Sequence, residues 1–335
     1  MRVGGPASHF VEVTSDAELI ESVTEADKRD EPVLLIAGGS NLVISDAGFA
    51  GLTVRIATRG VVITPSSDSD DTLVRAAAGE NWDRLVAQLV SDGYSGIETL
   101  SGIPGSVGAT PVQNVGAYGS EVAGLIRAVE VYDRKTHQRQ TFTGEDCGFG
   151  YRTSVFKQQP NRWLILAVTL AVTQRSESVP IRYAELAETL AIAPGDATKP
   201  IQVRRAVLNI RRRKGMVLDI DDHDCWSAGS FFTNPVVEAD LADSLPEDAP
   251  RWPTADGRVK LSAAWLIEQA GFSRGWALTP ESPASLSKKH TLAVTNRGSA
   301  TAADIIDLAR AVNDGVHEKF GIALHPEPML IGCAL

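Results

Sequence analysis

Three polar side chains in this sequence lie among apolar or rigid neighbours, as catalytic groups often do. Arg152 lies in YRTSVFK (151–157), where its guanidinium could hold a carboxylate through two hydrogen bonds; a strand with solvated charges is the alternative. Ser230 lies in AGSFFTNP without a GxSxG elbow, which argues against a hydrolase serine and favours a buried hydroxyl in a turn. Glu327 lies between two prolines that would aim it rigidly, whereas a lone glutamate is usually solvated.

Two glycine-rich segments could bring backbone N–H groups close to a ligand. The first, GGSN at 38–41, follows an apolar strand predicted at 32–37 and could approach phosphate oxygens; a tight structural turn is the alternative. It matches neither the GxGxxG fingerprint nor a P-loop. The second, at 102–119, is dense in glycine within an apolar stretch, which favours a bound flat or phosphorylated ligand over turns alone.

Two charged segments follow in the second half of the chain. The helix predicted at 202–214 carries a basic run, and such a run is usually a solvated helix face; in an acidic chain a local phosphate site is the alternative. The run comprises Arg204, Arg205, Arg211, Arg212, Arg213 and Lys214. The acidic segment 219–224 is predicted to be a surface loop.

The elements that must position these residues are mixed. Ser15 and Glu18 form a capping box that opens a helix. A second helix shows apolar residues at i, i+3, i+4, i+7 and i+8 from Trp82. Further predicted segments are strands near 73–78, 128–133 and 163–173, a helix at 261–269 ended by Gly271, a final helix ended by Gly321, and an extended segment at 323–332. Strands and helices without regular alternation predict an α+β fold.

Composition narrows the possible functions. The net charge of −10 argues against nucleic-acid binding, and no apolar run is long enough to insert into a membrane. The start of the chain has no signal-peptide pattern. Its three cysteines are far apart, which excludes a CxxC metal or redox pair and fits buried structural thiols in a reducing cytoplasm. We therefore expect a cytoplasmic protein with no metal site.

Seven motifs, taken in order, resemble the UDP-N-acetylenolpyruvoylglucosamine reductase family. They are GGSNL at 38–42, AGENW at 78–82, GIPGSVGA and QNVGAYG within 102–119, FGYRTSVFK at 149–157, GSFFTNP at 229–235, KLSAAWLIEQAG at 260–271 and HPEP at 325–328. Each motif alone is weak, but together they span almost the whole chain. The chain is similar to the longer form of the family, which carries a substrate-closing tyrosine.

The resemblance implies an α+β fold with a vanillyl-alcohol-oxidase-type, two-part FAD-binding domain and a smaller α+β substrate-binding domain. The implied domains are residues 1–55 as FAD-binding subdomain 1, completed by about 322–335, residues 56–200 as FAD-binding subdomain 2, and residues 215–321 as the substrate-binding domain.

The resemblance also assigns roles to residues. Arg152 would bind the substrate carboxylate, Ser230 would donate a proton, and Glu327 would help to stabilise the enolic intermediate. Tyr183, Lys214 and Asn234 would bind substrate. The implied FAD contacts are Gly38, Gly39, Ser40, Asn41, Leu42, Gly102, Pro104, Gly105, Ser106, Gly108, Ala109, Gln113, Asn114, Gly116, Ala117 and Tyr118.

The implied activity is NADPH-dependent reduction of UDP-N-acetylenolpyruvoylglucosamine to UDP-N-acetylmuramate through non-covalent FAD, in peptidoglycan precursor synthesis. Hydride would reach the enolpyruvyl methylene carbon, and the adjacent carbon would take a proton. The partners expected are these small molecules alone, with a monomeric protein. The alternatives are another flavin oxidase or dehydrogenase of this fold, acting on a sugar or alcohol, and a non-catalytic nucleotide-binding module.

Overall fold

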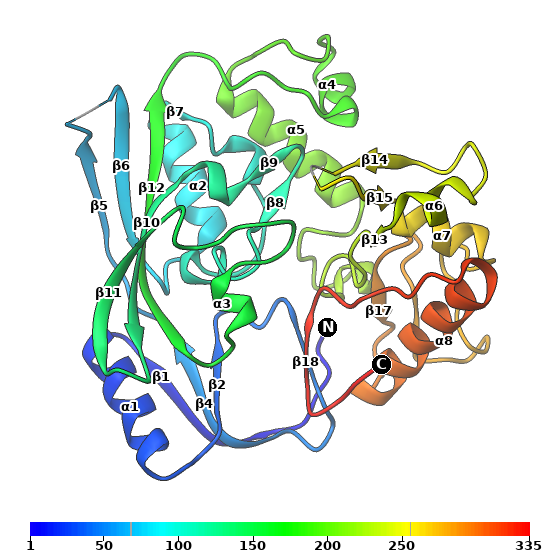
Figure 1. Cartoon of the computed structure of the whole chain (residues 1–335), viewed down its shortest axis with the longest axis horizontal. Helices are drawn as coiled ribbons and strands as arrows, with labels where there is room; N and C mark the ends of the chain where they lie inside the picture. The colour runs from blue at the N-terminus through cyan, green and yellow to red at the C-terminus, as the bar shows by residue number, and fades with distance from the viewer. Residues whose placement is uncertain (68, 255) are drawn as a thin grey trace. The chain divides into compact units, whose positions relative to one another are not determined.

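A computed structural model describes residues 1–67, 69–254 and 256–335, and it divides into two compact units. Unit 1 comprises residues 1–6, 40–49 and 213–335 (Figure 1). Unit 2 comprises residues 7–39 and 50–212. The chain therefore crosses between the units more than once, and each unit joins segments that are far apart in sequence. The three-part division expected from the sequence stays a prediction.

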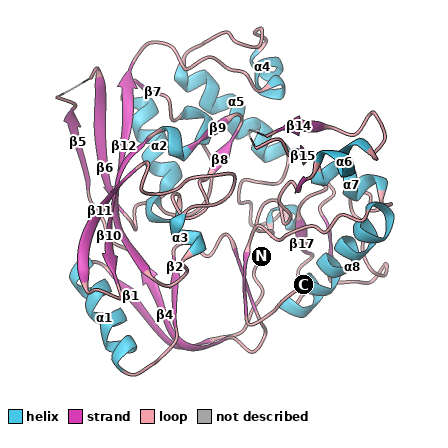
Figure 2. Ribbon diagram, viewed as in Figure 1, coloured by secondary structure: helices cyan, strands magenta, loops and turns pink. Residues whose placement is uncertain are grey.

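Unit 2 is built on a six-stranded sheet with the order β11-β10-β12-β6-β5, and β7 pairs with β12 (Figure 2). Its strands are β5 (Val61–Pro65), β6 (Asp71–Ala77), β7 (Tyr94–Ser95), β10 (Ile126–Asp133), β11 (Gln138–Thr143) and β12 (Trp163–Gln174). Val168 of β12 pairs with Val129 on one side and with Ala76 on the other, in antiparallel register. Since β12 is central and almost entirely buried, it reads as a continuous apolar run.

Helix α2 (Trp82–Ser91) packs its apolar stripe against this sheet. Trp82 is fully buried, and its indole Nε1 donates to the carbonyl of Leu100 at 2.9 Å. Asn81 caps the helix by accepting from the Arg84 N–H at 2.9 Å. The helix predicted from the apolar spacing is confirmed, and its first turn is anchored beside the second glycine-rich segment.

A second sheet in unit 2 has the order β1-β4-β2. Its strands are β1 (Ala7–Val13), β2 (Val33–Ile36) and β4 (Phe49–Ile56), and β2 runs parallel to β4. Helix α1 (Asp16–Lys28) begins at the predicted capping box of Ser15 and Glu18. Helices α4 (Ala184–Leu190) and α5 (Pro200–Arg213) share a separate small core that includes Ile181 and Val207.

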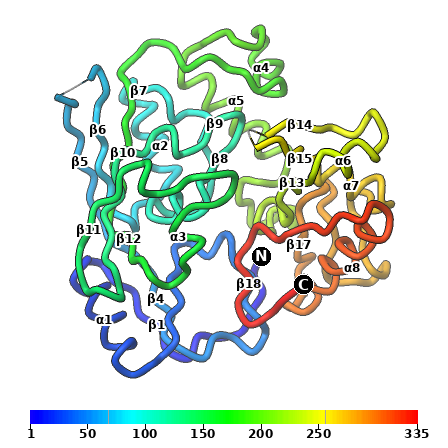
Figure 3. The backbone as a smooth tube through the Cα atoms, viewed as in Figure 1, coloured from blue at the N-terminus to red at the C-terminus, as the bar shows by residue number. Residues whose placement is uncertain are grey.

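Unit 1 has its own core around α7 (Ala263–Gln269) and α8 (Ala302–Phe320). Gly271 follows α7 with φ +99°, and Gly321 caps α8 with φ +68°, as their sequence positions predict. The C-terminal strand β18 (Met329–Ile331), red in Figure 3, lies parallel to β3 (Leu42–Ile44). The extended C-terminal segment therefore pairs with a strand that follows the first glycine turn.

The remaining elements are short. The strands are β8 (Gly116–Ala117), β9 (Ser120–Glu121), β13 (Val236–Val237), β14 (Arg251–Pro253), β15 (Val259–Leu261), β16 (Ala284–Leu286) and β17 (Val294–Asn296). The helices are α3 (Val155–Gln158), α6 (Ala239–Asp243) and the 3-10 turns η1 (Glu98–Leu100), η2 (Val107–Ala109), η3 (Val122–Gly124) and η4 (His223–Cys225). In the part of the chain that the structure describes, no helix is both long and apolar enough to cross a bilayer.

Candidate functional site

Gly38 of the first glycine-rich segment and Gly105 of the second lie close together within unit 2. A Cβ atom placed on Gly38 would lie 3.9 Å from the Cα of Gly105. Gly39 has φ +66°, and a Cβ there would meet nothing within 4 Å. Within residues 1–67, 69–254 and 256–335, no backbone carbonyl accepts from the N–H groups of Gly38 or Gly39. The end of β2 therefore presents exposed backbone donors without side chains in front of them.

The segment around Gly105 is anchored on the start of α2. The Trp82 N–H donates to the Gly105 carbonyl at 3.1 Å, and the Val107 N–H donates to the Glu80 carbonyl at 2.8 Å. A Cβ on Gly108 would lie 2.5 Å from the Cβ of Ala78. Gly108, a predicted FAD contact, is therefore required for packing whether or not it touches a ligand.

Asn114, another predicted FAD contact, has its polar atoms engaged inside the protein. It is buried with φ +46°, its Nδ2 donates to Glu121 at 2.8 Å and to the Gly150 carbonyl at 3.1 Å, and its Oδ1 accepts from the Ala123 N–H. These bonds tie the second glycine loop to the turn that precedes Arg152. Asn114 thus organises the site, which its position in a motif did not reveal.

Arg152 lies in a turn between Gly150 and Thr153, followed by helix α3, so the strand considered from its sequence is wrong. Its φ of +53° is unusual for a residue with a side chain, and such conformations concentrate at functional sites. The Nη2 atom donates to the Gly116 carbonyl at 3.0 Å. The structure therefore brings the predicted carboxylate-binding arginine to the second glycine loop.

Two tyrosines and a buried arginine lie beside these loops. Tyr118 and Tyr183 meet edge to face, with ring centroids 5.5 Å apart. Burial raises the pKa of Tyr118 to about 12, and its hydroxyl forms a hydrogen bond with Arg211. The Arg211 Nε donates to the Gly102 carbonyl at 3.1 Å. Sequence reasoning left Arg211 within a basic run, but it is 8% exposed, so the solvated-face interpretation is wrong for this residue.

Unit 1 brings together the other two predicted catalytic residues. The Glu327 N–H donates to the carbonyl of Phe231, the residue after Ser230, at 2.8 Å. The Ser230 Oγ lies 3.2 Å from the Nε2 of His290. Which of these two atoms donates the hydrogen bond depends on the histidine tautomer. The Asn41 Nδ2 donates to the Glu327 carbonyl at 3.3 Å. Sequence reasoning did not find His290, because it lies 60 positions from Ser230.

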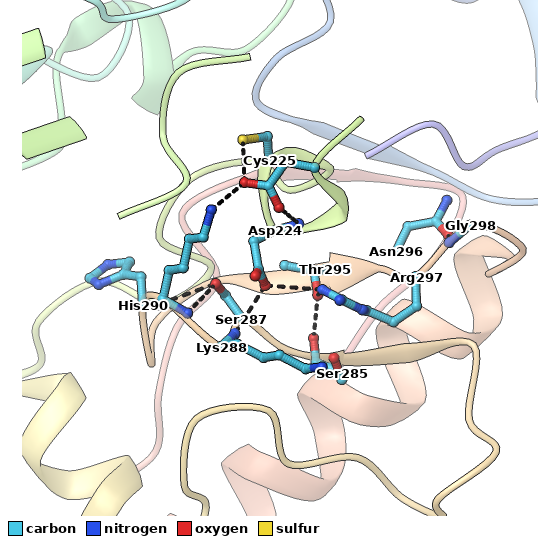
Figure 4. A network of polar contacts seen from close by, with 12 residues as sticks. Asp224, Cys225, Ser285, Ser287, Lys288, His290, Thr295, Asn296, Arg297 and Gly298 are labelled. Atoms are coloured by element: carbon cyan, nitrogen blue, oxygen red, sulfur yellow. Dashed lines mark hydrogen bonds and ion pairs between the residues drawn. The ribbon is translucent and has the colours of Figure 1, made fainter. Parts of the chain in front are cut away.

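The buried carboxylate of Asp224, paired with Arg297, holds the turn that carries His290 (Figure 4). The carboxylate of Asp224 accepts from the Lys288 N–H at 2.9 Å and from the Arg297 Nη1 at 3.0 Å. The Ser287 Oγ accepts from the His290 N–H at 3.2 Å. Asp224 is 5% exposed, so the prediction of a surface loop over 219–224 is wrong at its last residue. Charge-assisted hydrogen bonds to the Asp224 carboxylate therefore hold this turn in place.

The remaining predicted substrate residues lie near helix ends. Asn234 is partly buried, and its Oδ1 accepts from the Ala263 N–H at the start of α7, at 3.0 Å. Lys214 follows directly after α5 and is also partly buried. Tyr183 precedes α4 and is 41% exposed.

Two models of known protein families match parts of this chain. Residues 221–331 match the family model described as UDP-N-acetylenolpyruvoylglucosamine reductase, C-terminal domain, and residues 7–136 match the one described as FAD binding domain. The mixed fold predicted from the sequence, an FAD-binding part followed by a smaller domain, is thereby confirmed.

Full-length relatives point the same way. The UDP-N-acetylenolpyruvoylglucosamine reductase of Cutibacterium acnes is 50% identical over 100% of this chain and 88% of its own length. The reductase of Saccharopolyspora erythraea is 52% identical over 100% of this chain and 93% of its own. The crystal structure of the reductase from Thermus caldophilus shares the fold, with a TM-score of 0.64 over 98% of this chain and 94% of that one at 24% identity. The chain belongs to the UDP-N-acetylenolpyruvoylglucosamine reductase family.

Proposed function

We propose that this protein uses bound FAD and NADPH to reduce UDP-N-acetylenolpyruvoylglucosamine to UDP-N-acetylmuramate, a step of peptidoglycan precursor synthesis. The observation that carries the proposal is that 50–52% of residues are identical to such reductases in alignments that cover the entire chain. The contact between the backbones of Glu327 and Phe231, next to Ser230, supports it within unit 1.

Gly38, Gly39 and Gly105, which all belong to unit 2, suit the binding of FAD. Exposed N–H groups on Gly38 and Gly39 suit a diphosphate, which needs donors rather than acceptors. The open space beside Gly39 lets a nucleotide lie against the backbone, and Gly105 brings the second glycine loop next to Gly38. Bound FAD supplies the hydride chemistry that links NADPH to the enolpyruvyl group. We propose that residues 38–42 and 102–118 hold it non-covalently.

Arg152 has the chemistry needed to hold the substrate carboxylate. A vinyl ether conjugated to a carboxylate becomes more negative as it accepts hydride, and a guanidinium stabilises that charge through two parallel hydrogen bonds. The bond from Nη2 to the Gly116 carbonyl restricts the orientation of the guanidinium before substrate arrives. Arg152 therefore binds and orients in this proposal, and it transfers no proton.

Ser230 supplies the proton to the carbon next to the one that accepts hydride. Its hydroxyl is a weak acid, but an enolate-like carbon is basic enough to take its proton. The neighbouring His290 Nε2 can orient the hydroxyl across the 3.2 Å contact. Glu327 helps to stabilise the enolic form of the substrate; its N–H donates to the Phe231 carbonyl, and its own carbonyl accepts from the Asn41 side chain.

Three further residues complete the proposed substrate site. Lys214 and Asn234 contact the diphosphate and the sugar, and Tyr183 closes over the substrate as in the longer form of the family. The edge-to-face packing of Tyr183 on Tyr118 supports this role, because it places an exposed phenol beside the second glycine loop. We also propose that the protein acts as a monomer in the cytoplasm, since one chain carries every residue assigned a role.

The deciding experiment measures NADPH consumption by the purified protein with and without the UDP-enolpyruvyl sugar. The proposal requires consumption that depends on this substrate and yields UDP-N-acetylmuramate. Substrate-independent turnover, or oxygen uptake with simple sugars or alcohols in place of it, would instead identify a flavin oxidase. Light scattering on the same sample tests the monomer.

A further inference from the structure

We propose that Asp83, Arg204 and Arg211 form a clamp on Gly102, here called the Gly102 clamp, that positions the second glycine loop for FAD. The inference deepens the proposed function and rests on it, since it assigns positioning residues to the same cofactor site. These three side chains come from helices α2 and α5 of unit 2, and none belongs to the motifs that identify the family.

Both polar groups of the Gly102 backbone are held by charged side chains. The Gly102 N–H donates to Asp83 Oδ1 at 2.6 Å, and the Gly102 carbonyl accepts from Arg211 Nε at 3.1 Å. The residue has φ +72°, and a Cβ on it would lie 2.8 Å from the Leu208 Cδ2. A loop with only short regular elements thus begins at a residue whose backbone is held by side chains of two helices.

Asp83 is itself held by Arg204 in a two-point ion pair. Arg204 Nη1 lies 2.5 Å from Asp83 Oδ1, and Nη2 lies 3.0 Å from Oδ2. The Arg204 side chain is 12% exposed and that of Asp83 is 33% exposed. Burial works to raise the pKa of Asp83, but Arg204 and the Gly102 N–H outweigh it and the pKa is lowered. The carboxylate therefore stays charged and keeps accepting from the glycine.

Arg211 extends the clamp to the other half of the loop. Burial lowers its pKa, while Tyr118 and Asp83 favour the charged form. The guanidinium of Arg211 forms hydrogen bonds with both Gly102 and Tyr118. The start and the end of the stretch 102–118 are therefore both attached to helix α5. Tyr118 in turn packs on Tyr183, so the clamp also supports a proposed substrate residue.

This arrangement explains the basic run of α5 differently from either sequence interpretation. Arg204 and Arg211 are neither solvated nor a phosphate site, since their donors are directed at Asp83, Gly102 and Tyr118. Burying charges is costly, and well-packed apolar residues often fill such a space at least as stably. Their benefit here is orientation of a glycine that has no side chain of its own to pack.

The test compares the holoenzyme of Asp83→Asn with Asp92→Asn, a control at the exposed end of the same helix. FAD release after dilution, followed by the rise in flavin fluorescence, should be about tenfold faster in Asp83→Asn, as expected when a hydrogen bond to a charged group is weakened. The visible flavin spectrum should shift as well. Asp92→Asn should match the wild type in both measurements.

Two further variants guard against a purely structural effect. Arg204→Lys keeps the charge but loses the two-point geometry, and should also speed FAD release. The double variant Asp83→Asn/Arg204→Lys should release FAD no faster than the worse of the two single variants, because the pair acts as one unit. If the wild-type protein reduces the UDP-enolpyruvyl sugar but FAD release and the flavin spectrum are unchanged in Asp83→Asn and Arg204→Lys, the clamp alone is overturned. A wild type without that activity would overturn the proposed function.

Discussion

Replacing Ser230 with alanine should damage the chemistry far more than the fold. In the folded protein its Oγ lies 3.2 Å from His290 Nε2, and losing one such hydrogen bond costs about 0.5–1.5 kcal/mol of stability. Losing a positioned general acid slows its step by about 10²–10⁴-fold. That slowing corresponds to roughly 3–5 kcal/mol of barrier. The two effects therefore differ enough to be separated experimentally.

Rapid mixing resolves the two half-reactions in which the effect must appear. Reduction of the bound flavin by NADPH should keep a near-normal rate in Ser230→Ala, because Arg152 and the glycine loops are untouched. Reoxidation of the reduced flavin by the UDP-enolpyruvyl sugar should carry the whole loss. Ser230→Cys should be less impaired, since a thiol can also donate a proton. A melting curve on each variant reports the small cost to the fold.

One pattern of results refutes this reasoning. If Ser230→Ala slows reduction by NADPH and leaves reoxidation by the substrate unchanged, the serine is not the proton donor. A variant that melts far below the wild type would instead show that Ser230 mainly supports the fold, and the cysteine variant would then decide its chemical role.

Three other predictions follow from the same structure. Arg152→Lys keeps the charge but loses the planar fork and the bond to Gly116, so kcat/KM for the sugar substrate should fall, and unchanged steady-state kinetics would remove its role. FAD at 100 times its Kd should stabilise the fold by about 2.7 kcal/mol, and a melting temperature that ignores added FAD would contradict the assigned cofactor. Gly108→Ala should destabilise by about 1–3 kcal/mol in denaturant titrations, because its Cβ would lie 2.5 Å from that of Ala78. Gly124→Ala, where a Cβ meets nothing within 4 Å, is the matched control, and equal losses at both positions would refute the packing argument.

Local signals in the sequence predicted the elements that local forces determine. Ser15 and Glu18 satisfy the first N–H groups of α1 by themselves, so the start of that helix could be read from four residues. The stripe that begins at Trp82 repeats with the helical period, and α2 follows it. Gly271 and Gly321 end α7 and α8 because glycine adopts a positive φ at little cost.

The motifs of the family likewise predicted the chemical groups and the cofactor. Short segments such as GIPGSVGA and HPEP keep their residue types together in the chain, so recognising them needs no knowledge of distant contacts. They could not show which of their members touch a ligand and which hold the site together. Asn114 and Gly108 were predicted as FAD contacts, yet internal bonds and close packing already require them.

The tertiary structure alone decided the environment of the charged residues. Arg211 reads as one of several arginines on a basic helix, but folding buries it against Gly102 and Tyr118. Asp224 reads as part of an acidic loop, but it is buried against Arg297 and the turn that leads to His290. The reason is physical: burial and pairing depend on which segments meet, and these partners lie from 64 to 109 positions apart in the chain. A residue's type and its near neighbours determine what it can do, whereas its distant contacts determine whether it binds a ligand, holds a loop or remains in water.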